Sequence, residues 1–190
     1  MPKMLKTLPV LIGLLLLGVG HAIPKEKLQG NFNGEFRYTG GTLACITDSL
    51  SEEGGYHPCL HIGSVEIGAT IAEVEAMFGE PWRTIPRSDS EEIRVYVLRS
   101  KRKPLPYLVV TFQNQKVAVI QMTGFQTEDS LAFSSIELGA TQKQVIRILG
   151  KPGSKHTGPQ IEGELWSYKP FPISLEIKDQ KVFSIRIWKP

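Results

Sequence analysis

The residues best suited to chemistry lie in one short stretch, His57-Pro58-Cys59-Leu60-His61. Alternate residues of an extended strand point to the same side, so its two imidazoles and a thiolate could bind zinc or copper. Pro58 interrupts regular strand pairing, however, and the chain has only one other cysteine, Cys45. We therefore predict a Cys45–Cys59 disulfide flanked by surface histidines, with no bound metal and no cofactor. A metal site in this stretch is the alternative.

A hydrolytic site is not indicated by the sequence. A nucleophile needs an activating base and a third group that orients the base. His156 lies in a stretch rich in glycine and proline, residues 153–159, where a solvated loop histidine is the ordinary expectation. No Gly-x-Ser-x-Gly, paired-carboxylate or phosphate-loop pattern occurs in a suitable context. We predict that the protein is not an enzyme.

The densest group of charges is Arg99-Ser100-Lys101-Arg102-Lys103. Such a basic loop could contact an acidic protein or anionic lipid head groups, so peripheral membrane contact is one prediction. The alternative is a solvated hairpin tip that binds nothing.

Four aromatic residues, Tyr96, Trp166, Tyr168 and Trp188, are the other candidate partner-binding residues. Large aromatic side chains with few rotamers make good interface anchors. The same residues would equally suit the core between two sheets, and the sequence leaves both interpretations open.

The N-terminus has the pattern of a cleavable signal peptide over residues 1–22. Lys3 and Lys6 precede an apolar run at 8–19, and Gly20-His21-Ala22 offers small residues for cleavage. No cysteine follows the run, so no lipoprotein anchor is expected, and the mature chain is predicted to be periplasmic or secreted. Removing the two lysines leaves 20 basic against 19 acidic side chains, which gives no reason to expect a nucleic-acid partner.

Two stretches, 68–81 and 139–152, read almost alike. Each has a threonine that can cap a helix, Thr70 or Thr141, and a glutamate or glutamine three residues later that can complete a capping box. Each then has apolar residues at helical spacing and ends in Gly-x-Pro, which stops a helix. The pattern predicts two short helices and a duplicated unit.

From this repeat we predict an α+β fold. A β-hairpin around Gly40-Gly41, in an extension at 23–61 that begins with a flexible lead over 23–33, precedes repeat one at 62–123. A linker at 124–132 leads to repeat two at 133–190. Each repeat is expected to be one helix followed by three antiparallel strands, with 82–92 and 153–159 as loops. Strand alternation predicts the residues that pack beneath the helices: Leu108, Val110, Phe112, Ala118, Ile120, Met122, Ile173, Leu175, Ile177, Phe183, Ile185 and Ile187.

The motif that carries a resemblance is a short strand, Gly-small-Thr, a helix, Gly-x-Pro, an aromatic strand such as Trp166-Ser167-Tyr168, and a closing hairpin. Together, over about residues 62–190, these features resemble the BamE/SmpA-like and β-lactamase-inhibitor-protein (BLIP)-like superfamily. The resemblance implies two tandem units whose sheets form one concave surface that binds a protein. The chain departs from BamE in having no lipoprotein cysteine and from BLIP in having no cysteine in either repeat, so no contact residue is carried over.

The function predicted from the sequence is a non-catalytic, extracytoplasmic protein-binding module. The resemblance implies a role in cell-envelope (outer-membrane) assembly or in inhibition of a secreted or periplasmic enzyme. The alternative is an envelope protein that binds a small ligand or a metal.

Overall fold

The computed structural model describes residues 28–32, 34–39, 42–46, 59–158 and 161–190. The predicted signal peptide, His57 and the Gly40-Gly41 turn lie outside these residues. Two helices and twelve strands are described. In chain order they are β1 (Glu35–Thr39), β2 (Thr42–Ile46), β3 (His61–Ile62), β4 (Val65–Glu66), α1 (Ile71–Phe78), β5 (Arg83–Ser88), β6 (Glu91–Val97), β7 (Tyr107–Gln113), β8 (Lys116–Thr123), α2 (Gln142–Leu149), β9 (Ser154–Gly158), β10 (Ile161–Ser167), β11 (Ile173–Lys178) and β12 (Lys181–Trp188).

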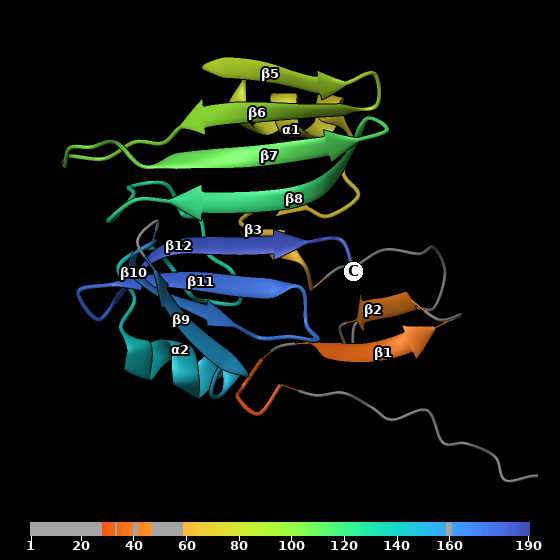
Figure 1. Ribbon diagram of the computed structural model, residues 1–190. Helices are drawn as coiled ribbons and strands as arrows, with labels where there is room; N and C mark the ends of the chain where they lie inside the picture. The colour runs from red at the N-terminus through yellow and green to blue at the C-terminus, as the bar shows by residue number, and fades with distance from the viewer. Residues whose placement is uncertain (1–27, 33, 40–41, 47–58, 159–160) are drawn as a thin grey trace, which may run out of the picture.

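One antiparallel sheet of eight strands dominates the fold, in the order β5-β6-β7-β8-β12-β11-β10-β9 (Figure 1). Its middle is the pairing of β8 with β12, from Val119 opposite Trp188 to Thr123 opposite Ser184. The predicted tandem repeat of helix-plus-three-strand units is therefore wrong: the protein is mostly antiparallel β, and one sheet runs without interruption from β5 to β9. Joining β8 to β12 pairs backbone groups that two separate sheets would leave at exposed edges.

Both edge strands of this sheet were predicted to be loops. β5 contains Pro86 and is exposed along most of its length, and β9 carries Lys155 and His156, which are exposed. A strand at the edge buries little side-chain surface and tolerates proline, so it lacks the apolar alternation by which strands are recognised. Each half of the sheet consequently has four strands instead of the expected three.

The helix predictions are confirmed in detail. The N–H of Glu73 donates to Thr70 Oγ1 at 3.3 Å while the N–H of Thr70 donates to the Glu73 carboxylate at 2.7 Å. Thr141 and Gln144 repeat this capping box at 3.3 and 2.8 Å. Gly79 and Gly150, at φ 72° and 80°, end the two helices.

The two helices cover the same side of the sheet. On α1, Glu75 forms an ion pair with Arg94 of β6, and Phe78 lies 5.4 Å from the ring of Tyr96. At the end of α2, the carbonyl of Gly150 accepts a hydrogen bond from Tyr168. The main core lies between the helices and this side of the sheet, and α1 is seen behind β5 and β6 in Figure 1.

Two β-bulges shift the predicted core pattern by one residue. Pairing changes register between Thr111 and Phe112 and again between Glu176 and Ile177. As a result Val117 and Val182 are buried, whereas Ala118 and Phe183, which simple alternation places in the core, are only partly buried. A bulge adds one residue to a strand and so reverses the inside–outside alternation beyond it.

The N-terminal hairpin and its disulfide are confirmed. β1 pairs with β2, and Cys45 is bonded to Cys59 with a Cα–Cα distance of 5.6 Å. Because disulfides persist in oxidising compartments, the bond fits an extracytoplasmic location.

Residues 28–32 are not the expected flexible lead. Leu28 and Phe32 are buried, the N–H of Asn31 donates to the carbonyl of Arg147 at 3.0 Å, and Phe32 stacks on Phe36 of β1. This segment fastens the hairpin to the end of α2.

Candidate functional site

Three of the four candidate aromatic residues belong to the core. Tyr96, Trp166 and Tyr168 are 3%, 0% and 2% exposed. Tyr96 and Trp166 lie in one cross-strand row on the helix-covered side of the sheet, which continues to Lys155 on β9. Tyr168 comes just after β10. Of the two interpretations left open by the sequence, the core one applies to these three residues.

Trp166 is also held by polar contacts. Its indole N–H donates to the Glu164 carboxylate, and Lys155 Nζ lies 4.2 Å from its ring centroid. The pKa of Glu164 is lowered because this N–H stabilises the carboxylate, with Lys155 adding to the effect. Trp166 is therefore a structural residue that joins β10 to the edge strand β9.

The other side of the sheet, which we call the open face, carries Trp188. Directly paired residues of neighbouring strands point to the same side, so the register defines three rows across this face. The first row is Ile85, Ile93, Thr111, Val119 and Trp188. The second row is Arg83, Val95, Val109, Gln121, Arg186, Ser174, Ser167 and Ser154. The third row is Val97, Tyr107, Thr123, Ser184, Glu176, Leu165 and His156.

Within the first two rows an apolar shelf is formed by Ile85, Ile93, Val95, Val109 and Val119, with the exposed Arg83 at the β5 end of the second row. All five shelf residues are partly buried, so each keeps some contact with solvent. In the third row Val97 and Tyr107 are 46% and 39% exposed. Apolar side chains from β5 to β8 thus stay in contact with solvent on one continuous surface.

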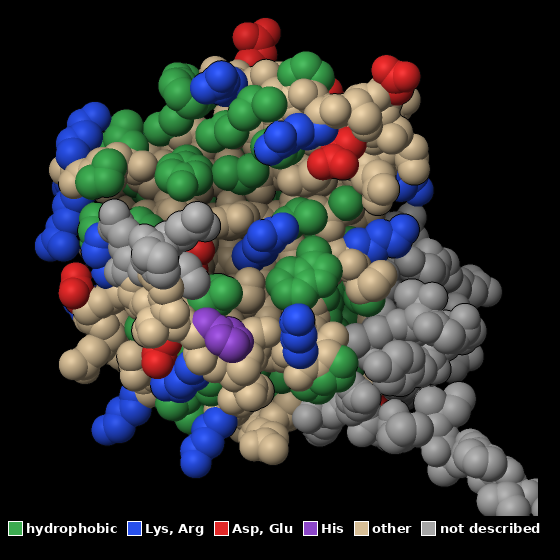
Figure 2. All heavy atoms as spheres, viewed as in Figure 1, with side chains coloured by type: hydrophobic (Ala, Val, Ile, Leu, Met, Phe, Trp, Pro, Cys, Tyr) green, Lys and Arg blue, Asp and Glu red, His purple; other side chains and the backbone are tan. Residues whose placement is uncertain are grey.

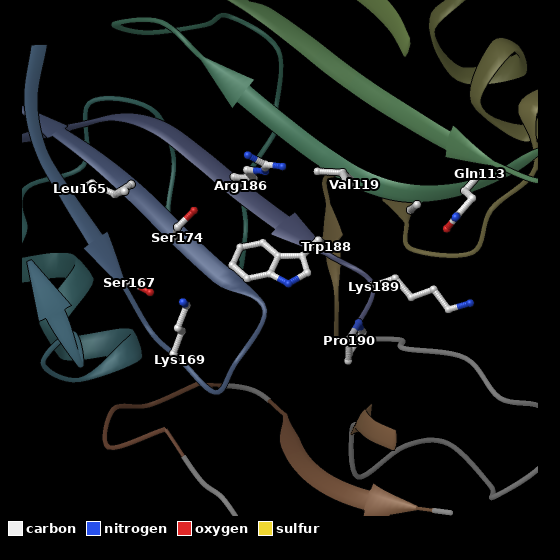
Figure 3. Close-up of a pocket in the computed structure, with 11 residues that line it drawn as sticks. Gln113, Val119, Leu165, Ser167, Lys169, Ser174, Arg186, Trp188, Lys189 and Pro190 are labelled. Carbon is white, nitrogen blue, oxygen red and sulfur yellow. The ribbon is translucent and has the colours of Figure 1, made fainter. Parts of the chain in front are cut away.

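Next to the shelf lies the Trp188 hollow, with a volume of about 720 Å³. Figure 3 shows the indole of Trp188 between Arg186 and Lys169, with Lys189 extending away on the other side. Ser167 and Ser174 line the wall formed by β10 and β11, and Val119 connects the hollow to the shelf. Arg186 shares this hollow with Lys169, from a turn 17 residues away, and no sequence pattern indicated that the two lie together.

The hollow is cationic. Arg186, Lys169 and Lys189 line it, and no acidic side chain does. Glu176, in the third row, is the one acid of the three rows, and burial raises its pKa. Figure 2 shows basic and hydrophobic side chains intermixed over this view of the molecule.

The basic loop is partly neutralised within the chain. Arg99 Nε lies 2.7 Å from Asp129 Oδ1, and Lys101 Nζ lies 3.6 Å from Glu128 Oε1. The pKa of Asp129 is lowered although burial acts to raise it, because the backbone and side chain of Arg99 both donate to the carboxylate. Arg102 lines a second hollow, of about 750 Å³, beside Phe125 and Lys178, and Lys103 is exposed. The structure does not bring this loop together with Trp188.

The histidines do not form a cluster with other metal ligands in the described part of the chain. Nδ1 of His61 lies 2.7 Å from the carbonyl of Gly63. His156 is on strand β9 and not in a loop, opposite Leu165. Among the described residues no three His, Cys, Asp or Glu side chains are placed to hold a metal ion, and no described helix is long and apolar enough to span a membrane.

No protein-family model matches this chain, and no curated protein matches it. Solved structures do resemble it at low identity. A cysteine-rich secretory protein from Staphylococcus aureus is 17% identical with a TM-score of 0.43, over 65% of this chain and 44% of its own length. A DUF4309 family protein from Bacillus subtilis is 19% identical with a TM-score of 0.45, over 67% and 84%. An extracellular SCP-domain protein from Bacillus anthracis is 13% identical with a TM-score of 0.42, over 74% and 50%.

These structures correct the predicted resemblance. They are described as secretory, DUF4309 and SCP-domain proteins and not as BamE/SmpA or BLIP-like ones, so the predicted superfamily is wrong. This chain spans less than half of the first of them and half of the third. At these identities and scores, none of them carries an argument about what this chain does.

Proposed function

We propose that this chain is a non-catalytic binding protein that works outside the cytoplasm and holds another protein on the open face of its sheet. The observation that carries the proposal is the position of Trp188. Its indole lies in a hollow that continues into a shelf of partly buried aliphatic side chains from other strands. Apolar side chains that gather on one face and stay partly open to solvent are a feature of protein-interaction sites.

The arrangement suits an interface in two further respects. The strands that carry the face are held by a well-packed core on their other side, so the surface is preorganised. Tryptophan and arginine, which lie side by side at Trp188 and Arg186, are the residue types that most often supply binding energy.

Residues 1–22, as a signal peptide, would place the mature chain in the periplasm or outside the cell. The disulfide supports this destination, because it needs an oxidising compartment. N-terminal sequencing of the protein from culture fractions tests it: a mature N-terminus at Ile23 is expected, and a retained Met1 would contradict the proposal.

Replacing Trp188 tests the proposed function. The mature protein and its Trp188→Ala variant are immobilised, and proteins captured from the native extracytoplasmic fraction are quantified by mass spectrometry. We expect at least one protein captured by the wild type to fall by roughly tenfold or more with Trp188→Ala, as for an interface hot spot. Trp82→Ala is the matched control, since Trp82 is 70% exposed but lies just after α1, outside the three rows.

Two results would count against the proposal. One is the same set of captured proteins for Trp188→Ala and the wild type. The other is loss of capture in the Trp82→Ala control to the same degree, which would place the interface elsewhere. Thermal unfolding of each variant establishes that it is folded.

A small anionic molecule is the second candidate occupant, because the volume of about 720 Å³ lies in the range of small-ligand sites. Native mass spectrometry of the protein purified from its source distinguishes the two. A co-purifying small molecule that is lost with Trp188→Ala favours this candidate over a protein partner.

A further inference from the structure

The charges around Trp188 indicate which kind of partner the open face would bind. This inference rests on the function proposed above. Several cations elsewhere in the protein are paired. Arg94 contacts Glu75 and Glu92, Arg99 contacts Asp129, and Lys155 contacts Glu164. None of the three cations of the Trp188 hollow forms an ion pair within the described residues, and neither does Arg83 at the β5 end of the second row.

The single acid in the three rows does not neutralise these cations. Glu176 lies opposite Ser184, two residues from Arg186 on β12, yet no ion pair joins Glu176 to Arg186. The hollow therefore keeps its positive charge for a ligand. Charges of one sign gathered in a concave site attract a partner of the opposite sign and speed its association.

The apolar shelf favours a partner larger than a simple anion. The first and second rows run from Trp188 and Arg186 on β12 across β8, β7 and β6 to β5. Paired strands lie about 4.8 Å apart, so these five strands span roughly 20 Å. A carboxylate alone would satisfy the cations and leave the shelf exposed, whereas a polypeptide with acidic and apolar side chains would cover both.

We infer that the open face binds an acidic segment of a partner protein, with carboxylates beside Arg186 and Lys169 and an apolar side chain against Trp188. The remaining apolar residues of the segment lie on the shelf formed by β5 to β8.

Nuclear magnetic resonance provides a direct test, because the three tryptophans report on three places. The indole N–H of Trp188 lies in the hollow, that of Trp166 is bonded to Glu164, and that of Trp82 lies outside the open face. The mature protein, labelled with ¹⁵N, is titrated with a short blocked peptide of alternating glutamate and phenylalanine. The same peptide with glutamine for glutamate is the uncharged probe.

We expect the acidic peptide to shift the Trp188 indole signal while those of Trp82 and Trp166 stay in place. The double variant Arg186→Gln/Lys169→Gln should bind the peptide roughly tenfold more weakly, and added salt should weaken wild-type binding. Lys143→Gln/Arg147→Gln removes the same charge from exposed positions on α2 and should change little.

Several outcomes would overturn the inference. These are no shift at Trp188 with the acidic peptide, equal binding of the glutamine peptide, or an unaffected double variant. Binding of polyglucuronate without binding of the peptide would also overturn it, in favour of an anionic glycan.

Failure of this inference can be told apart from failure of the proposed function. If Trp188→Ala abolishes capture of a protein partner but Arg186→Gln/Lys169→Gln does not, the open face is an interface whose partner is not selected by acidity.

Discussion

Thr123 on β8 and Ser184 on β12 meet at the middle of the sheet, where their hydroxyl oxygens lie 3.0 Å apart although 61 residues separate them in the chain. Both residues are buried, and Gln121 Nε2 donates to the hydroxyl oxygens of both, at 3.3 and 3.1 Å. This polar cluster sits where β8 pairs with β12, the contact that makes one sheet out of two sets of four strands.

Replacing Ser184 with alanine should weaken this junction. The change removes the hydrogen bonds that Thr123 and Gln121 each make with Ser184 and leaves only the one between Gln121 and Thr123, for an expected loss of about 1–2 kcal/mol in the free energy of unfolding. Urea unfolding measures it. Ser174→Ala is the control, since Ser174 is half-buried on the same face and lies opposite Arg186 instead of in the cluster. Equal losses for the two variants would contradict a specific role for the cluster.

Gly30→Ala should detach the N-terminal segment from α2. A Cβ at residue 30 would lie 2.2 Å from the backbone carbonyl oxygen of Ile148, which cannot move without disturbing the helix. We expect a loss of roughly 1–3 kcal/mol and faster hydrogen exchange of the Asn31 amide, which donates to Arg147. The control is Gly158→Ala, where a Cβ meets nothing within 4 Å. Unchanged exchange at Asn31 would show that the segment stays docked.

Removing the disulfide should lower the free energy of unfolding without unfolding the eight-stranded sheet. Cys45 and Cys59 are 14 residues apart in sequence, for which chain entropy predicts about 3 kcal/mol. The Cys45→Ala/Cys59→Ala variant is compared with the oxidised wild type by chemical unfolding, with far-ultraviolet circular dichroism reporting the sheet. The ring centroids of Phe36 and Phe171 lie 4.7 Å apart, so the β1–β2 hairpin should stay packed against the rest of the protein. A variant as stable as the wild type would refute the prediction.

Glu176 should make stability rise as the pH falls from neutral. Burial raises the pKa of this carboxyl in the folded protein, so the folded state binds the proton more readily than the unfolded state, whose pKa is about 4.3. At pH values above the folded-state pKa, the ionised Glu176 carboxylate therefore destabilises the folded protein. This destabilisation disappears as the pH falls from the folded-state pKa to the unfolded-state pKa.

The test is to compare Glu176→Gln with the wild type between neutral pH and about pH 4, because other carboxyls titrate in the same range. The variant should be more stable than the wild type at neutral pH, and the difference should shrink on acidification. Glu80→Gln, at an exposed position after α1, should show no such trend. A difference that is constant with pH would mean that burial does not act on Glu176.

Local features could be predicted from the sequence because the interacting groups are close in the chain. Each capping box joins residues three apart, and a glycine ends each helix through its own backbone conformation. The disulfide could be predicted because the chain has only two cysteines and begins with a pattern typical of an export signal. The hairpin β1–β2 followed from two short strand patterns on either side of a pair of glycines.

The residues of the candidate site could be recognised only in part. Trp188 was identified by its residue type, but the same reasoning ranked Trp166 equally as an anchor. Trp166 is buried because the helices pack against its side of the sheet, and its residue type does not distinguish a core position from an exposed one.

The sequence by itself determined the helices with their caps, the hairpin, the disulfide and most strands, since each depends on neighbouring residues or on a simple period. Only the tertiary structure decided that β8 pairs with β12, that two polar stretches become edge strands, and that two bulges reverse the alternation beyond them. Those outcomes depend on backbone pairing between residues far apart in the chain, and that pairing brings Trp188, Arg186 and Lys169 to one hollow.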